Sequence, residues 1–106
     1  MNARTRARYE ARARILKALA HPTRLFLVDE LSRAEHSVAD LTRMVGTDIS
    51  TVSRHLARLQ AIGILQSERR KTEVYYHLRV PCVLRFFGCI EAVIRDTARE
   101  QLRLAR

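Results

Sequence analysis

The stretch SVADLTRMVGTDISTVSRHLARLQAIGIL, residues 37–65, contains two runs of helical apolar spacing separated by a turn. Ser37 is a typical helix N-cap, and Gly46 is a typical residue at a helix end, so the first run predicts a short helix between them. Thr47 or Asp48 can cap the second, longer helix. The stretch therefore predicts two consecutive helices joined by a tight turn.

The second of these helices runs to about Ile62, where Gly63 ends it. Its apolar residues recur at the spacing of one buried stripe, which comprises Ile49, Val52, Leu56 and Leu59. With that stripe turned inward, the helix presents a polar and basic face to solvent, made of Ser50, Thr51, Arg54, His55 and Arg58, with Ser53 at its margin.

The flanking segments complete one domain over residues 1–106. Apolar spacing and proline positions predict a helix over 4–20, a helix from Pro22 to about Ser32, and a final helix from Pro81 to about Leu104. Residues 64–68 and 73–79 predict two strands of a hairpin whose tip is Arg69-Arg70-Lys71-Thr72. This order predicts a mainly α protein with a small β-hairpin: a winged helix-turn-helix with five helices, in which 37–62 form the helix-turn-helix and 64–79 the wing.

The charge of the chain favours a polyanionic partner. Its 20 basic and 11 acidic residues give a net charge of +9, and 18 of the basic residues are arginines, whose planar guanidinium binds phosphate and guanine in a bidentate manner. No stretch resembles a membrane span or a signal peptide, so we expect a cytoplasmic protein without a membrane partner, whose two cysteines stay reduced.

The stretches ALAHPTRLFLVDEL, SVADLTRMVGTDISTVSRHLARLQAIGIL and VYYHL resemble the ArsR/SmtB family of small dimeric bacterial repressors. The resemblance covers roughly residues 14–79 without an insertion. It implies a homodimer formed through the first and last helices, residues 1–20 and 81–106. It also implies repression of transcription at an inverted-repeat operator in double-stranded DNA.

The polar face of the second helix in the helix-turn-helix supplies the candidate DNA contacts. The N-terminal part of a recognition helix approaches the base edges, so we expect base contacts from Ser50, Thr51 and Arg54, with Arg54 on guanine. Arg58 suits a phosphate, and His55 suits either a base contact or a packing role. The candidate DNA-binding set is completed by Ser53 and by the wing residues Arg69, Arg70 and Lys71.

Both cysteines, Cys82 and Cys89, lie in the predicted last helix. The metal sites common in the family are incomplete here: the positions that would match a Cys-Val-Cys pair hold Ser37 and Ala39. The positions that would match the zinc-type site hold Val80, Cys82, Val93 and Asp96. Seven residues along one helix separate the sulfurs by about 10.5 Å, too far to share an ion within one chain.

The last helix carries two apolar stripes. Cys82, Phe86, Cys89 and Val93 form a 4-3-4 seam for packing on another helix, and Val83, Phe87, Ile90 and Ile94 form a neighbouring stripe for the chain's own core. If two copies cross near Arg85 and Phe86, Cys82 of one chain faces Cys89 of the other.

Such an intersubunit pair suits a soft inducer, namely trivalent arsenic or antimony or another soft metal ion; no other cofactor is expected. The alternatives are oxidation of the same thiols by persulfide or peroxide, and cysteines that only pack.

Two other classes of function have weaker support in the sequence. An enzyme needs a nucleophile with a base or paired carboxylates in a cleft, and the best available pair is Cys82 with His77, so we expect no enzymatic activity. A generic RNA-binding or membrane-surface module would explain the charge, but aromatic residues suited to base stacking are scarce.

Overall fold

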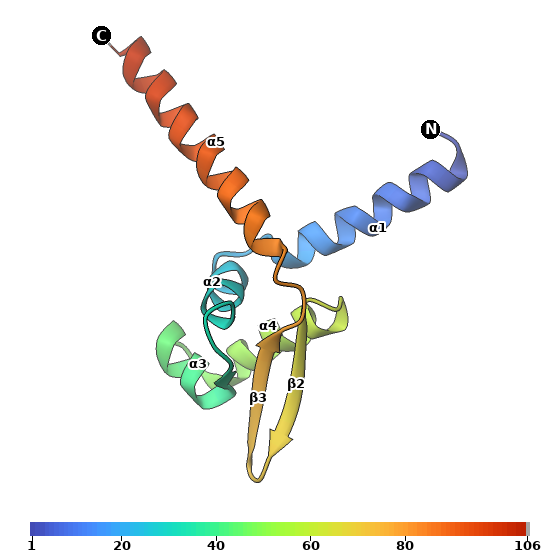
Figure 1. Ribbon diagram of the computed structural model, residues 1–106, viewed down its shortest axis with the longest axis vertical. Coiled ribbons are helices and arrows are strands. Elements are labelled where there is room, and N and C mark those ends of the chain that lie inside the picture. The colour runs from blue at the N-terminus through green and yellow to red at the C-terminus, as the bar shows by residue number, and fades with distance from the viewer. Residues whose placement is uncertain (106) are drawn as a thin grey trace.

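The computed structural model describes residues 1–105, which form five helices and a three-stranded antiparallel sheet (Figure 1). The helices are α1 (Ala3–Leu19), α2 (Pro22–Leu31), α3 (Val38–Val45), α4 (Ile49–Ala61) and α5 (Val83–Leu104). The strands are β1 (His36–Ser37), β2 (Leu65–Arg70) and β3 (Glu73–Leu78). The predicted order of helices and hairpin is confirmed.

The helix-turn-helix is fixed by the caps that the sequence predicts. The Ser37 side chain accepts a hydrogen bond from the backbone N–H of Asp40 at 3.1 Å and so caps α3. Gly46 ends α3 with φ 81°, a left-handed conformation that glycine adopts without strain. Of the two candidate caps of α4, Asp48 is the one used, since it accepts from the Thr51 N–H at 3.0 Å.

The sheet has one strand more than the sequence predicts. β3 lies in the middle, pairing with β2 on one side and with the two-residue β1 on the other, where His36 is opposite Tyr76. A strand of two residues shows no alternating pattern, so it was missed. The hairpin tip is also shorter than predicted, because Arg69 and Arg70 belong to β2 and only Lys71 and Thr72 form the turn.

The core lies within α2, α3, α4 and the sheet, sealed by the C-terminal end of α1. Its completely buried residues are Leu27, Val28, Leu41, Val52, Leu56 and Leu59. The prediction that Ile49 joins this core is wrong, because its side chain is 55% exposed. Helical spacing alone does not reveal that the first turn of α4 extends past the part of the helix covered by the core.

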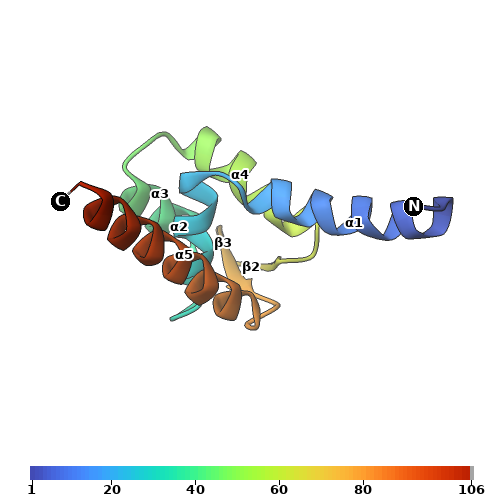
Figure 2. The same ribbon diagram turned by 90° about the horizontal axis from the view of Figure 1, so that it is seen from above.

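The helices α1 and α5 extend from this body as two arms, with their free ends on opposite sides of the molecule (Figures 1 and 2). Within the described residues, α5 contains no fully buried side chain. Val83 and Phe87 pack against the core as predicted, but Ile94 is 56% exposed, so the predicted inward stripe covers only the start of the helix. None of the helices in residues 1–105 is long and apolar enough to span a bilayer.

Candidate nucleic-acid interface

The outer face of α4 carries most of the predicted DNA contacts. Ser50, Arg54 and Arg58 are exposed, and Thr51 and Ser53 are partly exposed at its sides. Because Val52, Leu56 and Leu59 anchor the opposite face in the core, the outer face is held in a fixed orientation. The arrangement presents short polar groups at the start of the helix and guanidinium groups farther along.

Hydrogen bonds organise the first turn of α4. The Thr51 hydroxyl donates to the Asp48 carboxylate at 2.6 Å, and Arg54 approaches the Thr51 oxygen at 3.5 Å. The hydrogen bonds from the Thr51 side chain and backbone lower the pKa of Asp48. Since its one proton is directed to Asp48, Thr51 offers a ligand a hydrogen-bond acceptor.

His55 is directed toward the body, where it takes part in a contact between three helices. Its Nδ1 accepts a hydrogen bond from a guanidinium nitrogen of Arg24 on α2 at 3.1 Å, because arginine can only donate. Its ring lies 4.5 Å, centroid to centroid, from that of His21, whose own Nδ1 caps α2 by accepting from the Thr23 N–H. Of the two roles predicted for His55, the packing and hydrogen-bonding role is the one this geometry supports.

Arg24 links this contact to α1. It is buried, with 8% of its surface exposed, and its Nε donates to the carbonyl oxygen of Ala18 while another nitrogen lies 3.5 Å from that of Lys17. These carbonyls belong to the last turn of α1, where a positive charge also complements the helix dipole. Burial, and then the nearby positive charge of Arg58, lower the pKa of Arg24.

The sequence prediction missed Arg24 among 18 arginines. Its position three and four residues before Leu27 and Val28 was the available signal, because that spacing puts it on the buried face of α2. Burial, followed by the charges of His21, Arg24, Arg54 and Arg58, lowers the pKa of His55 and so favours the neutral ring that accepts from Arg24.

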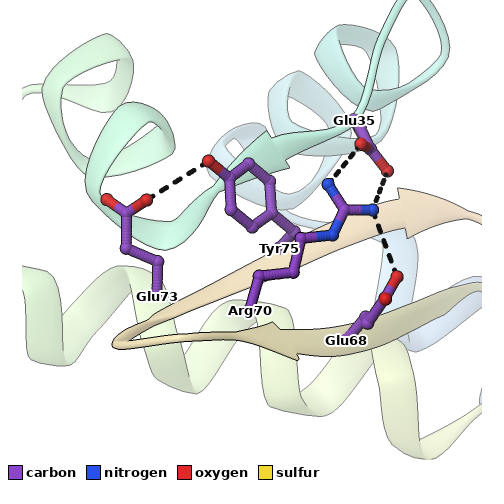
Figure 3. A network of polar contacts seen from close by, with 5 residues as sticks. All are labelled: Glu35, Glu68, Arg70, Glu73 and Tyr75. Atoms are coloured by element: carbon purple, nitrogen blue, oxygen red, sulfur yellow. Dashed lines mark hydrogen bonds and ion pairs between the residues drawn. The ribbon is translucent and has the colours of Figure 1, made fainter.

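The three basic residues predicted in the wing differ in their contacts. Arg69 and Lys71 are exposed, and Lys71 occupies the turn with φ 56°. Arg70 instead binds Glu35 through two hydrogen bonds, of 2.6 and 3.0 Å, and Glu68 through one of 3.1 Å (Figure 3). Its guanidinium also lies over the Tyr75 ring, 4.6 Å from the centroid, so Arg70 fastens the hairpin to the loop before β1.

Cys82 and Cys89 are free and exposed thiols on the α5 arm. Cys82 occupies the N-cap position of α5 without a side-chain capping bond, one residue before the helix rather than in its first turn as predicted. Two helical turns separate the thiols, so they remain too far apart to share one ion within a chain. In residues 1–105, no group of three or more His, Cys, Asp or Glu side chains is placed to hold a metal.

Comparison with known proteins agrees with this geometry. Residues 19–68, which include the helix-turn-helix, match the family described as a helix-turn-helix domain. The HTH-type transcriptional regulator YgaV of Escherichia coli is 36% identical over 78 residues, which are 73% of this chain and 79% of YgaV. The transcriptional repressor PagR of Bacillus anthracis is 35% identical over 72 residues, 67% of this chain and 72% of PagR.

The fold is also similar to a solved structure. The homodimeric winged helix-turn-helix DNA-binding domain of a possible ArsR-family transcriptional regulator from Mycobacterium bovis superimposes with a TM-score of 0.78 and 28% identity, covering 94% of this chain and 93% of that one. The cap-defined helix-turn-helix, the wing and these relatives lead to one assignment. The chain belongs to the ArsR/SmtB family of winged helix-turn-helix transcriptional regulators.

Proposed function

We propose that this protein is a homodimeric repressor that binds an inverted-repeat operator through α4 and the wing. It leaves the operator when a soft thiophilic inducer occupies Cys82 and Cys89. The observation that carries the DNA-binding part is the exposed face of α4, on which Arg54 and Arg58 follow Ser50 and Thr51 while the opposite face is buried. The relative PagR, named as a repressor, supports the direction of regulation.

Exposed apolar surface on the arms supports the homodimer. Phe86, Val93 and Ile94 of α5 are 44%, 64% and 56% exposed, and Leu16 of α1 is 47% exposed. An apolar hollow of about 310 Å³ lies between α1, α2 and α5. Surface of this kind is suited to burial by a second copy, and the homodimeric Mycobacterium bovis domain offers a precedent.

The exposure of both thiols supports a site between subunits. Because two turns of α5 separate Cys82 and Cys89 in one chain, a shared ligand requires one sulfur from each subunit. Antiparallel crossing of two α5 helices near Arg85 and Phe86 would form two equivalent dithiol sites. A ligand in these sites would shift the arms and thereby change the separation of the two α4 helices, at a coupling of about 1–3 kcal/mol.

The DNA-binding part is tested by selecting operators from a random duplex library and measuring affinity by fluorescence anisotropy at fixed salt. We expect selection of an inverted repeat whose half-sites are about one helical turn, or a multiple of it, apart. The protein should also prefer this duplex strongly to single strands and to random duplex. Equal affinity for all three nucleic acids would refute sequence-specific repression and support a general nucleic-acid binder.

The sensing part is tested on the reduced protein bound to that operator. Arsenite, phenylarsine oxide, Hg(II), Zn(II) and a polysulfide are titrated into the wild type and into Cys82→Ser and Cys89→Ser. If one soft reagent releases the wild type from the operator and neither variant responds, the result supports the inducer site. If polysulfide alone releases the protein, the result supports the redox alternative. If no reagent and neither substitution changes operator affinity, the cysteines have only a packing role.

Mixed dimers distinguish a site between subunits from a site within one. A dimer of one Cys82→Ser chain and one Cys89→Ser chain retains one complete pair across the interface and no complete pair within either chain. We therefore expect it to recover about half of the inducer response that both homodimeric variants lose. If the mixed dimer is as unresponsive as the variants, the intersubunit pair is excluded.

A further inference from the structure

Ile49 is an aliphatic side chain exposed at the start of the DNA-facing helix. It is the first residue of α4 and is 55% exposed, whereas Val52, one turn later, is completely buried. Leaving such a side chain in water forgoes stabilisation that burial would give. Because the core of the chain leaves Ile49 uncovered, its side chain is accessible to a partner that binds α4.

The polar residues around Ile49 are already engaged with one another. Asp48 accepts hydrogen bonds from the Thr51 backbone and hydroxyl, and Arg54 approaches the same hydroxyl. Ile49 follows Asp48 in the chain, lies on the side of α4 away from Thr51, and carries no hydrogen-bonding group on its side chain. The start of α4 therefore presents its polar groups on one side and one exposed apolar group on another.

The major groove of DNA contains one apolar group that identifies a base, the C5 methyl of thymine. The first residues of a recognition helix lie nearest the base edges. The positive charges of Arg54 and Arg58, together with the chain's net charge of +9, complement the phosphates and hold this helix against the groove. An aliphatic side chain at this position thus matches a thymine methyl in both place and polarity.

We infer that Ile49 contacts the C5 methyl of a thymine in each half-site and is a specificity-determining residue of the operator complex. This inference rests on the proposed DNA-binding function. Removing the methyl contact should weaken binding by about 4-fold in one half-site and about 15-fold in both, as expected for burying one methyl-sized group per site.

Uracil isolates this contact because it lacks only the thymine methyl. Each thymine of the selected operator is replaced in turn by uracil, and affinity is measured by anisotropy at fixed salt for the wild type, Ile49→Ala, Ile49→Val and Met44→Ala. Met44 is 39% exposed on α3, so its truncation removes a comparable apolar group from outside α4.

We expect one thymine per half-site at which uracil costs the wild type and Met44→Ala about 4-fold. At the same position, uracil should cost Ile49→Ala nothing and Ile49→Val an intermediate amount. Equal uracil penalties in all four proteins, a wild type indifferent to uracil at every position, or a selected operator without thymine would each overturn the inference. Failure to select any operator would instead refute the proposed function, so the two failures are distinguishable.

Discussion

The body of the molecule, α2 to α4 with the sheet, buries its apolar residues within one chain, whereas the arms α1 and α5 leave most of theirs exposed. In the body, residues from α2, α3 and α4 such as Leu27, Leu41 and Leu56 are inaccessible to water. In the described part of α5, no residue is fully buried, and Val93 is 64% exposed. Apolar periodicity therefore has two meanings in this sequence: in the body it specifies packing within the chain, and on the arms it marks the surface that the proposed dimer would bury.

The largest expected effect comes from charging the α5 seam. Val93→Asp should place a carboxylate in the proposed dimer interface, prevent the two α4 helices from binding together, and lower operator affinity by about 100-fold or more, the usual gain from linking two binding modules. Arg99→Asp places a carboxylate on the exposed side of the helix away from both Val93 and Ile94 and is the control. Sedimentation and anisotropy give both readouts, and a Val93→Asp dimer with full affinity would contradict the division between arms and body.

A change in the body should separate recognition from association. Arg54→Ala is expected to cost about 1–3 kcal/mol of operator binding and to relax specificity at one base pair per half-site, because a bidentate contact to guanine is lost. Sedimentation should show an unchanged dimer. Arg58→Ala is the comparison variant: loss of a phosphate contact should weaken all sequences alike. If Arg54→Ala weakens all sequences equally, its role is phosphate binding.

Arg24 should connect the two regions. Arg24→Met keeps a long, unbranched side chain but removes the donors to the α1 carbonyls, leaving the buried Ala18 oxygen without that partner. We expect the free energy of unfolding to fall by about 1–3 kcal/mol, the cost of an unsatisfied buried group. Denaturant titration measures this change, with Arg33→Met, at an exposed arginine two residues after the end of α2, as control. Equal stability of the two variants would show that Arg24 does not fasten the arm to the body.

The same contact should respond to pH through His55. Its pKa in the folded chain lies below that of the unfolded chain because of burial and nearby positive charge. As the pH falls through the ordinary histidine range, the unfolded chain therefore binds a proton that the native ring excludes, and the free energy of unfolding decreases. His55→Gln retains a neutral acceptor for Arg24 and should flatten this dependence between about pH 7 and 5.5. Parallel pH profiles for wild type and variant would contradict this role.

Local chemistry made the element boundaries predictable, and long-range contacts limited the rest. Ser37, Gly46 and Asp48 act within four residues of themselves, so the sequence indicates where α3 begins and ends and where α4 begins. The exposure of Ile49 depends on where the core stops covering α4, and β1 exists only because β3 pairs with it. The exposed polar face of α4 was therefore foreseeable from spacing, whereas the inward direction of His55 required its contact with Arg24.

The smallest effects distinguish two adjacent arginines within the body. Arg69 is an exposed wing residue, so Arg69→Ala should weaken operator binding a few-fold and reduce the slope of log affinity against log salt by about one. Arg70 is held by Glu35, Glu68 and the Tyr75 ring, so its charge is already balanced by carboxylates, and Arg70→Ala should leave that slope unchanged. Anisotropy across a salt series measures both. Equal slope changes would mean that Arg70 leaves its carboxylates for phosphate when DNA binds, and that the wing's internal contacts are a feature of the unbound protein alone.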